Sequence, residues 1–231
     1  MNNIAVIPAR GGSKRIPLKN IKDFNGAPLI SYSIKAALDS GVFSKVIVSS
    51  DDKKIIEVAT QYGACAPFVR DKSLADDFTG TYDVVVDAYK RLKQSGENID
   101  NVCCIYATAP LLHGFHLKRA YQKFIEEKAD TLTSICEFPF PIQRAFIEDP
   151  NGNIVYREPQ FAMTRSQDLQ PCYQDCGQFY FYTAQNLEGK VANLKRIGYA
   201  MPRYRVIDID TLDDFVYAQA ISKALEELNL E

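Results

Sequence analysis

The stretch NIAVIPARGGSKRIPLKN, residues 3–20, joins a short apolar run to a loop rich in positive charge. The run NIAVIPA is brief and dominated by branched residues, which is typical of a buried β-strand. No acidic residue precedes Asp23. The loop that follows the run carries two glycines among its cations: Arg10, Gly11, Gly12, Lys14, Arg15 and Lys19. Positive charge is therefore concentrated where the first predicted strand ends.

Further along the chain, apolar runs alternate with helical patterns. The apolar runs predict strands at residues 45–50, 66–69, 101–107, 131–137, 177–183 and 204–210. The 3.6-residue pattern predicts helices at residues 28–40, 51–63, 79–93, 115–127 and 212–228. Alternating strands and helices imply right-handed crossovers, so we expect an α/β fold with a doubly wound, mostly parallel sheet, similar to a Rossmann fold.

This alternation is interrupted between residues 137 and 175. The segment holds five prolines, a turn sequence DPNG at residues 149–152, and no long helical stripe. We expect an inserted, extended arm with a hairpin, within one domain of residues 1–231. An arm of this size is too small to form its own core. Its aromatic residues therefore need cover from the main body or from a second subunit: Phe138, Phe140, Phe146 and Phe161.

Composition excludes some classes of function. The chain of 231 residues is 46% hydrophobic with a net charge of -2, so no broad field favours nucleic acid or an anionic membrane. It has no apolar run near the roughly 18 residues of a membrane span, and its start lacks a secretory pattern. We therefore expect a cytoplasmic protein. Cys172 and Cys176 lack the second ligand pair of a zinc site, so reduced thiols are expected.

The cationic loop has the chemistry of a phosphate site. Ligands of doubly wound sheets bind beyond the carboxyl ends of the strands, where this loop begins. Gly11 and Gly12 allow a tight turn whose amides face an anion. Arg10 offers a planar fork of donors, and Lys14 and Lys19 offer point charges. The loop fits neither GxxxxGK[ST] nor GxGxxG, so we expect a different triphosphate cradle. A solvated basic loop is the alternative.

A second group of charges lies in VIDIDT, residues 206–211. On an extended strand, Asp208 and Asp210 point to the same side. Two carboxylates at this spacing suit a hard cation such as Mg²⁺. The alternative is a helix cap, in which Asp210 or Thr211 begins the last helix.

Five stretches carry a resemblance along nearly the whole chain: IPARGGSKRIPLKN, KVIVSSDD, LADDFTGT, IYATAP and IDIDTLDD. Together they resemble the cytidylyltransferases that activate nonulosonic acids, the relatives of CMP-sialic acid synthetase. PFPIQRAF (139–146) and RSQDLQPCYQDCGQFYFY (165–182) resemble most the branch of this family that acts on pseudaminic acid. Ala107 departs from that branch, which usually has proline there.

The resemblance implies a reaction in which CTP and a nine-carbon sugar acid give a CMP-sugar and pyrophosphate. It implies catalytic roles for Arg10, Lys14 and Lys19, a Mg²⁺ cofactor on Asp208 and Asp210, and a homodimer. The nucleotide-binding residues that it implies are Ala9, Arg10, Gly11, Gly12, Ser13, Lys14, Asn20, Arg70 and Thr81. The sugar-binding candidates are Tyr106, Gln143, Arg144, Arg165, Gln167, Asp168, Gln178 and Tyr180.

Several alternatives stay open. Tyr106 stands where sialic acid synthetases have a glutamine, so the acid acted on is a point of difference within the family. A sibling enzyme for sialic, legionaminic or a shorter ulosonic acid is one alternative, and a catalytically idle nucleotide-binding module is another. The intact basic loop and both terminal aspartates argue against the idle module. Arg144 and Arg165 either meet the sugar carboxylate or only bridge subunits.

Overall fold

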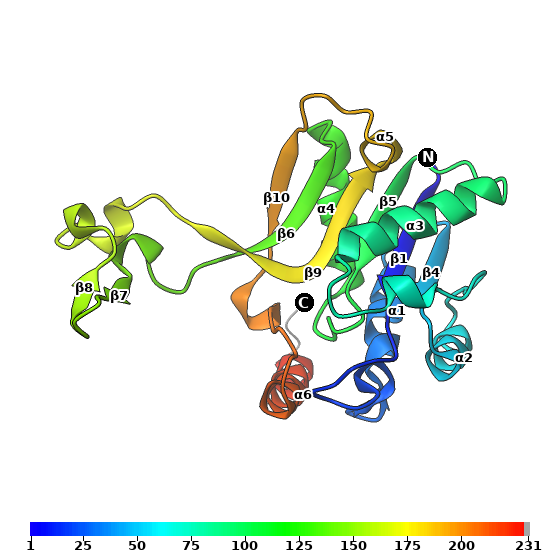
Figure 1. Ribbon diagram of the computed structural model, residues 1–231, viewed down its shortest axis with the longest axis horizontal. Helices are drawn as coiled ribbons and strands as arrows, with labels where there is room; N and C mark the ends of the chain where they lie inside the picture. The colour runs from blue at the N-terminus through cyan, green and yellow to red at the C-terminus, as the bar shows by residue number, and fades with distance from the viewer. Residues whose placement is uncertain (229–231) are drawn as a thin grey trace.

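The computed structural model describes residues 1–228, and these build a six-stranded sheet with helices on both faces and a projecting arm (Figure 1). The order of the strands across the sheet is β10-β6-β9-β5-β1-β4. Their bounds are β1 (Asn3–Pro8), β4 (Lys45–Ser49), β5 (Asn101–Ile105), β6 (Thr131–Glu137), β9 (Tyr173–Thr183) and β10 (Arg196–Ala200).

The directions of these strands confirm the predicted doubly wound, mostly parallel sheet. β1 runs parallel to both β4 and β5, and β10 runs parallel to β6. β9 is the exception, because it runs antiparallel to β5 and to β6. The chain crosses from β4 on one side of β1 to β5 on the other. β1 therefore lies at a switch in strand order, where α/β sheets bind ligands.

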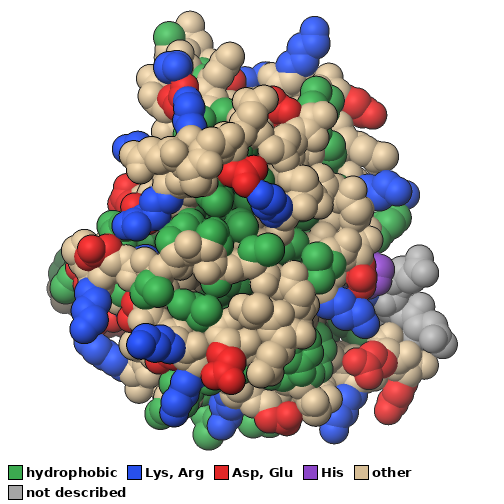
Figure 2. Space-filling model, turned by 90° about the vertical axis from the view of Figure 1, so that its right-hand side faces the viewer, with side chains coloured by type: hydrophobic (Ala, Val, Ile, Leu, Met, Phe, Trp, Pro, Cys, Tyr) green, Lys and Arg blue, Asp and Glu red, His purple; other side chains and the backbone are tan. Residues whose placement is uncertain are grey.

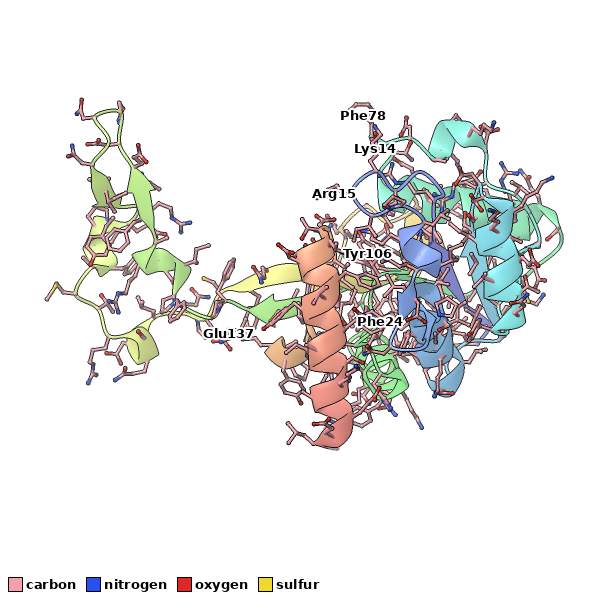
Figure 3. All side chains as sticks on the ribbon, turned by 90° about the horizontal axis from the view of Figure 1, so that it is seen from below. Lys14, Arg15, Phe24, Phe78, Tyr106 and Glu137 are labelled. Atoms are coloured by element: carbon pink, nitrogen blue, oxygen red, sulfur yellow. The ribbon has the colours of Figure 1, made fainter. Side chains whose placement is uncertain are left out.

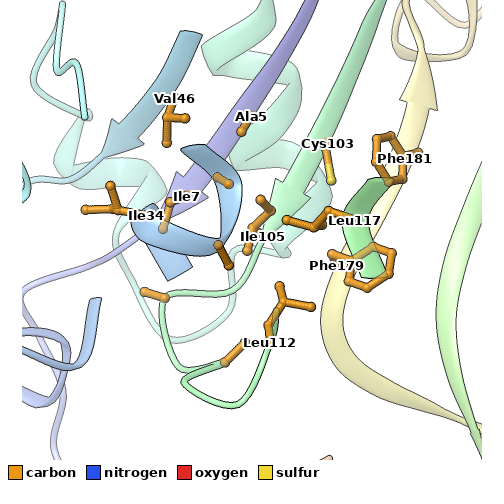
Figure 4. Close-up of a cluster of buried hydrophobic side chains, with 14 of the residues drawn as sticks. Ala5, Ile7, Ile34, Val46, Cys103, Ile105, Leu112, Leu117, Phe179 and Phe181 are labelled. Carbon is orange, nitrogen blue, oxygen red and sulfur yellow. The ribbon is translucent and has the colours of Figure 1, made fainter. Parts of the chain in front are cut away.

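Helices cover the two faces of the sheet. α1 (Leu29–Asp39), α2 (Lys53–Gln61) and α4 (Gly114–Glu126) pack on one face, and α3 (Thr81–Gln94) and α5 (Ala184–Leu187) on the other. β1 supplies both layers by simple alternation: Ala5 and Ile7 join the first cluster, shown in Figure 4, and Ile4 and Val6 join the second. All four are completely buried, so the strand after which the cationic loop begins is fixed on both faces.

Local sequence signals set several element boundaries. The Asp52 carboxylate caps α2 by accepting from the backbone amides of Lys54 and Ile55. Asn25 and Gly26 both have positive φ, 51° and 94°, which is the geometry of the tight turn that joins two-residue strands. These strands are β2 (Asp23–Phe24) and β3 (Ala27–Pro28). The last helix is α6 (Leu212–Glu227), and short 3₁₀ turns are η1 (Lys19–Ile21), η2 (Lys72–Leu74) and η6 (Arg203–Arg205).

Two predicted strands are wrong. Residues 66–69 run as coil, and Cys65 forms a single bridge to Ile47 instead. Residues 204–210 run through η6 and an extended segment outside the sheet, whereas the strand, β10, lies earlier at Arg196–Ala200. The alternation of VIDID is nevertheless kept, since Ile209 is completely buried while Asp208 is exposed. An alternating pattern therefore marked a segment packed on one side and not a hydrogen-bonded strand.

The predicted arm projects from the ends of β6 and β9, away from the body (Figure 1). Its hairpin pairs β7 (Phe146–Glu148) with β8 (Ile154–Tyr156) around the expected turn, and it also holds η3 (Ile142–Arg144), η4 (Pro159–Phe161) and η5 (Ser166–Asp168). Phe140 is 80% exposed and Met163 is 95% exposed. Among residues 1–228, the longest and most apolar helices fall short of what a membrane crossing requires.

Candidate active site

A small satellite core holds the cationic loop beside the acidic segment. Ile16 from the loop and Ile209 from the acidic segment are buried in one cluster with Phe24, Leu29 and Phe215. Phe24 and Phe215 pack edge to face, with ring centroids 5.5 Å apart. Each charged motif therefore carries its own apolar anchor, and the two anchors pack in the same place.

The cations of the loop are all engaged with acidic or carbonyl oxygens. Arg10 Nη1 lies 2.7 Å from Asp77 Oδ1, and Lys14 Nζ pairs with the other oxygen of the same carboxylate. Arg15 Nη2 lies 2.7 Å from Asp210 Oδ1, and Lys19 Nζ lies 3.8 Å from that oxygen. The loop thus bridges two acidic segments that are far apart in sequence. Figure 3 shows Lys14 and Arg15 on this loop.

Lys19 is the most enclosed of these cations. Its side chain is 17% exposed, and its Nζ donates to the Ile209 carbonyl. Burial lowers the pKa of Lys19, and the charges of Asp210 and Asp208 oppose that effect. The two carboxylates already offset part of the charge of this ammonium, so a cation bound to them would increase its attraction for an additional anion.

Gly11 serves close packing. A Cβ at this position would lie 2.8 Å from the Cβ of Asp52, so a side chain has no room. The Gly11 amide donates to Asp51 Oδ1 at 2.9 Å. The expectation that this amide faces an external anion is therefore not met in this structure, since its proton is used inside the protein. Ser13, further along the loop, does line a cavity.

Two neighbours fix the start of the loop. The Ala9 amide donates to the Ser49 carbonyl at 2.9 Å and so extends the pairing of β1 with β4. Asn20 is buried, and its Nδ2 donates to the Arg10 carbonyl at 3.0 Å. Asn20 also faces the cavities described next, so it contacts both the loop backbone and the space where a ligand would lie.

Two adjoining cavities lie at the carboxyl end of β1. One, of about 460 Å³, is lined by the loop: Pro8, Arg10, Ser13, Lys14, Arg15, Lys19, Asn20 and Asp77. The other, of about 260 Å³, has a mixed lining that includes Arg10, Asn20, Arg70, Leu74, Asp77, Thr79, Thr81, Val84, Tyr106 and Thr108. The cavities share Pro8, Arg10, Asn20 and Asp77, so they are two parts of one cleft. Cations line one part, and polar and apolar groups line the other.

The concentrated charge of this cleft is local. On the face shown in Figure 2, basic and acidic side chains are interspersed with hydrophobic ones, and neither sign covers a continuous area. Because cations line one part of the cleft and polar and apolar groups line the other, the cleft is suited to a small anion with an apolar or polar remainder, as a nucleotide has.

Arg70 and Thr81, two of the predicted nucleotide residues, lie in the smaller cavity. Arg70 is 4% exposed, and its guanidinium donates to the Ser49 hydroxyl at 3.1 Å and to the Ser49 carbonyl. Burial lowers the pKa of Arg70, an effect that the charge of Asp51 opposes. Thr81 Oγ1 lies 3.2 Å from the Tyr106 hydroxyl. The cavity therefore holds one buried cation and a pair of hydroxyl groups.

Tyr106 also lies beside Tyr180, a second predicted sugar residue. Their ring centroids are 5.6 Å apart, and the Tyr180 hydroxyl donates to Asp175 Oδ1 at 2.7 Å. Burial and then that hydrogen bond raise the pKa of Tyr180 far above its ordinary value. Gln178 is buried, and its side-chain amide donates to the Arg205 carbonyl. Gln178 thus braces the wall behind the cavity and does not line it.

The remaining sugar candidates lie on the arm and not in the cleft of the same chain. The Arg165 Nε donates to Asp168 Oδ2 at 2.7 Å, and Arg144 Nη1 lies 3.4 Å from the Ser166 hydroxyl. Figure 3 shows the arm extending from Glu137 away from Tyr106. The arm candidates are Gln143, Arg144, Arg165, Gln167 and Asp168. None of them lines either part of the cleft in this chain.

Asp208 and Asp210 are the carboxylate pair predicted for a divalent cation, and no group of three or more His, Cys, Asp or Glu side chains in residues 1–228 is arranged to hold a metal ion. Desolvation, and then the charge of Asp210, raise the pKa of Asp208 above its ordinary value. A like-charged pair of this kind gains from a cation between its members. The cap of α6 is supplied by Thr211, whose hydroxyl accepts from the Asp214 amide at 3.2 Å in a reciprocal capping box. Because Thr211 fills this role, the carboxylate of Asp210 is left to face Arg15 and Lys19.

Comparison with known proteins agrees with this geometry. A family model described as cytidylyltransferase matches residues 4–229. This chain belongs to the cytidylyltransferase family. A pseudaminic acid cytidylyltransferase of Campylobacter jejuni is 48% identical over 229 residues, which cover 98% of this chain and 99% of the relative. A CMP-N,N'-diacetyllegionaminic acid synthase of Legionella pneumophila is 32% identical, over 100% of this chain and 99% of the relative.

Solved structures support the same fold. A CMP:2-keto-3-deoxy-manno-octonic acid synthetase complexed with CTP superposes with a TM-score of 0.70 at 17% identity, over 97% of this chain and 99% of the other. A 4-diphosphocytidyl-2C-methyl-D-erythritol synthase from Anaerococcus prevotii gives a TM-score of 0.64 at 15% identity, over 96% and 98%. This cytidylyltransferase is a nucleotidyltransferase by family, and it shares its fold with both structures.

Sequence reasoning missed three contributors to the cleft of this cytidylyltransferase. Asp51 accepts from the Gly11 amide, Asp77 pairs with two loop cations, and Ile16 anchors the loop. Asp51 and Asp77 lie in the quoted stretches KVIVSSDD and LADDFTGT, but the sequence gives no distance to the loop. Ile16 was visible as an apolar residue among cations, which is a signal for an anchor.

Proposed function

We propose that this cytidylyltransferase transfers CMP from CTP to pseudaminic acid and releases pyrophosphate. The observation that carries the proposal is the 48% identity with a pseudaminic acid cytidylyltransferase over nearly the full length of both chains. The divided cleft supports it independently, because it places clustered cations beside a pocket with polar and apolar groups. A sialic or legionaminic acid synthetase is the second candidate, supported by the 32% identity with the legionaminic acid enzyme.

In this proposal the larger cavity takes the triphosphate and the smaller one takes the cytidine. Arg10, Lys14 and Lys19 neutralise the charge that grows on the departing pyrophosphate, which is the largest contribution a protein makes to such a reaction. Arg70 and Thr81 border the cytidine. The oxygen of the anomeric hydroxyl forms the new bond to the α-phosphorus while the bond to the β-phosphate oxygen breaks, and the hydroxyl proton is released.

Asp208 and Asp210 are the residues that would hold Mg²⁺. Their like charges and the raised pKa of Asp208 fit a hard cation, which in its bound form offsets phosphate charge and orients the phosphates. Lys19 donates to the carbonyl of Ile209, between the two aspartates, so the same segment positions an ammonium and two carboxylates. These side chains would bring the phosphates and their counter-charges to one edge of the cleft.

The arm would complete the sugar pocket of a second copy of the chain. Its exposed apolar residues, such as Phe140 and Met163, need a surface to cover them. Its polar candidates, including Arg144 and Arg165, lie away from the cleft of their own chain. A two-fold homodimer in which each arm reaches the other cleft meets both requirements.

The test is a coupled measurement of pyrophosphate release and product mass. With CTP, Mg²⁺ and pseudaminic acid, we expect one pyrophosphate for each CMP-sugar formed, and no release when EDTA is in excess or when the acid is omitted. UTP, ATP and GTP serve as matched nucleotide controls. Turnover that persists after complete chelation would contradict the metal assignment, and equal rates with UTP would contradict the assignment of the nucleotide.

A further inference from the structure

An acidic side chain occupies the cationic part of the cleft. The two oxygens of Asp77 contact two different cations of the loop: Oδ1 lies 2.7 Å from Arg10 Nη1, and Oδ2 pairs with Lys14 Nζ. Arg10 Nη1 also donates to the Asp76 carbonyl at 2.7 Å. Asp77 stands where both cavities meet, since it lines each of them. A carboxylate that bridges two cations in this way makes the kind of contacts that two oxygens of a phosphate group would make.

A preformed turn presents this carboxylate. Asp76 Oδ1 accepts from the amides of Phe78 and Thr79 at 3.0 and 2.7 Å, and from the Thr79 hydroxyl at 2.7 Å. The turn lies between η2 and α3, and its Phe78 side chain is 94% exposed, beside Lys14 in Figure 3. The backbone is therefore shaped by its own hydrogen bonds and not by packing of Asp77. Rotation of the Asp77 side chain would break both ion pairs without moving this backbone, while Arg10 Nη1 would keep its hydrogen bond to the Asp76 carbonyl.

We propose that Asp77 competes with the phosphates of the nucleotide for Arg10 and Lys14. This inference rests on the proposed function, in which these cations bind the triphosphate. In the empty cleft the carboxylate offsets the mutual repulsion of the loop cations and keeps them in position. When a triphosphate enters, the carboxylate becomes a like charge beside it and must leave. The observed affinity is then the intrinsic affinity multiplied by the fraction of molecules in which Asp77 does not occupy the two cations.

The same competition acts on the product. Pyrophosphate that has lost its bond to the nucleotide holds the cations less firmly than CTP does, because it has no cytidine in the adjoining cavity. Asp77 returning to Arg10 and Lys14 would then favour its departure. Removing the charge of Asp77 should therefore tighten the binding of CTP and of pyrophosphate alike.

The size of the effect follows from exposure. The side chains of Arg10 and Asp77 are each 38% exposed and that of Lys14 is 79% exposed. Ion pairs at such exposed positions change an equilibrium by about 1.5-fold to fivefold each. For the two pairs together we expect Asp77→Asn to lower the dissociation constants of CTP and pyrophosphate about threefold to tenfold. Cytidine, which lacks phosphates, should bind both proteins equally.

The experiment is calorimetric titration of the full chain with Mg²⁺–CTP, with pyrophosphate and with cytidine, in the absence of any sugar acid so that nothing is consumed. Asp83→Asn is the matched control, because it removes the same charge six residues away in the first turn of α3. Tighter binding of CTP and pyrophosphate in Asp77→Asn but not in Asp83→Asn supports the proposal. Weaker binding in Asp77→Asn would make Asp77 a ligand of the nucleotide or its metal, and overturns the proposal. Unchanged binding of both anions also overturns it.

These results are distinguishable from failure of the proposed function. If the parent protein binds pyrophosphate but not CTP, the nucleotide assignment is wrong, while the comparison of Asp77→Asn with the parent in the pyrophosphate titration still decides the role of Asp77. Adding Asp77→Asn to Arg10→Ala provides a second check. With Arg10 absent, the gain from neutralising Asp77 should fall, because one of the two ion pairs that it releases is already missing.

Discussion

Replacing Asp208 by asparagine should stabilise the protein while impairing its activity. Desolvation, followed by the charge of Asp210, raises the pKa of Asp208. A raised folded-state pKa means that the ionised carboxylate destabilises the native state as the pH rises through that pKa. The asparagine side chain has the same shape and no charge, so the substitution removes this cost at neutral pH. A variant that gains stability while losing function is typical of a site held under electrostatic strain.

The magnitude follows from the spacing. Two residues along an extended chain are about 6.7 Å apart, and two like charges at that distance repel by about 0.6 kcal/mol in water. With part of the desolvation added, we expect a gain of about 0.5–1 kcal/mol without metal. In a chain of this length, that raises the melting temperature by about 1–4 °C. Asp210→Asn is the matched control, because it loses the 2.7 Å ion pair with Arg15 and should not stabilise.

The assay combines thermal unfolding with Mg²⁺ titration of activity. The stabilisation by Asp208→Asn should be present at pH 7 and shrink in acid, as Asp208 of the parent becomes protonated and loses its charge. Both variants should need at least about tenfold more Mg²⁺ for half-maximal rate, because an amide lacks the carboxylate charge. The reasoning would be refuted if both variants lost the same amount of melting temperature and kept the Mg²⁺ titration of the parent. Asp208 and Asp210 would then have a structural role and would not bind the metal.

Three other changes test separate parts of the account. Arg10→Ala should lower kcat by about 10²–10³, as expected for a lost contact to transition-state charge, and a rate within twofold of the parent would contradict its role. Ile209→Ala should cost about 2–4 kcal/mol of stability because Ile209 is completely buried. Ile207 is only partly buried, so Ile207→Ala, the control, should cost less stability, and equal costs would refute the role of Ile209 as an anchor. Replacing residues 141–168 by a short glycine-serine linker should give monomers that bind CTP without sugar turnover, and light scattering of a monomeric, fully active parent would rule out the dimer.

Much of the fold was predictable because the sheet obeys simple periodicities. The apolar run of β1 and the helical stripe of α1 are signals that depend only on burial along the chain, and each lies where it was predicted. The wrong strand at residues 204–210 has a physical cause. Residues 204–210 alternate because Ile209 packs in the satellite core and Asp208 does not, and alternation alone does not distinguish such packing from pairing in a sheet.

The charged motifs of the candidate site were predictable from the sequence, but the contacts between them were not. The sequence indicated a cationic loop and a carboxylate pair, but not that Arg15 would join them through Asp210. Asp77 went unrecognised because its partners are 63 and 67 residues away, a distance that only the tertiary structure closes. Gly11 was expected to permit a turn, whereas it permits a close approach to Asp52, a distinction that needs coordinates.

Substrate choice is the most direct test of the central claim. The purified protein would be given CTP, Mg²⁺ and equal amounts of pseudaminic and sialic acids, with both CMP-sugars measured by mass. A pocket that pairs with particular polar groups rejects analogues that leave those groups unpaired, and such discrimination can reach about 10⁴-fold. We predict that kcat/KM for pseudaminic acid exceeds that for sialic acid by at least about 100-fold. Comparable values, or a preference for sialic acid, would contradict the assignment to pseudaminic acid.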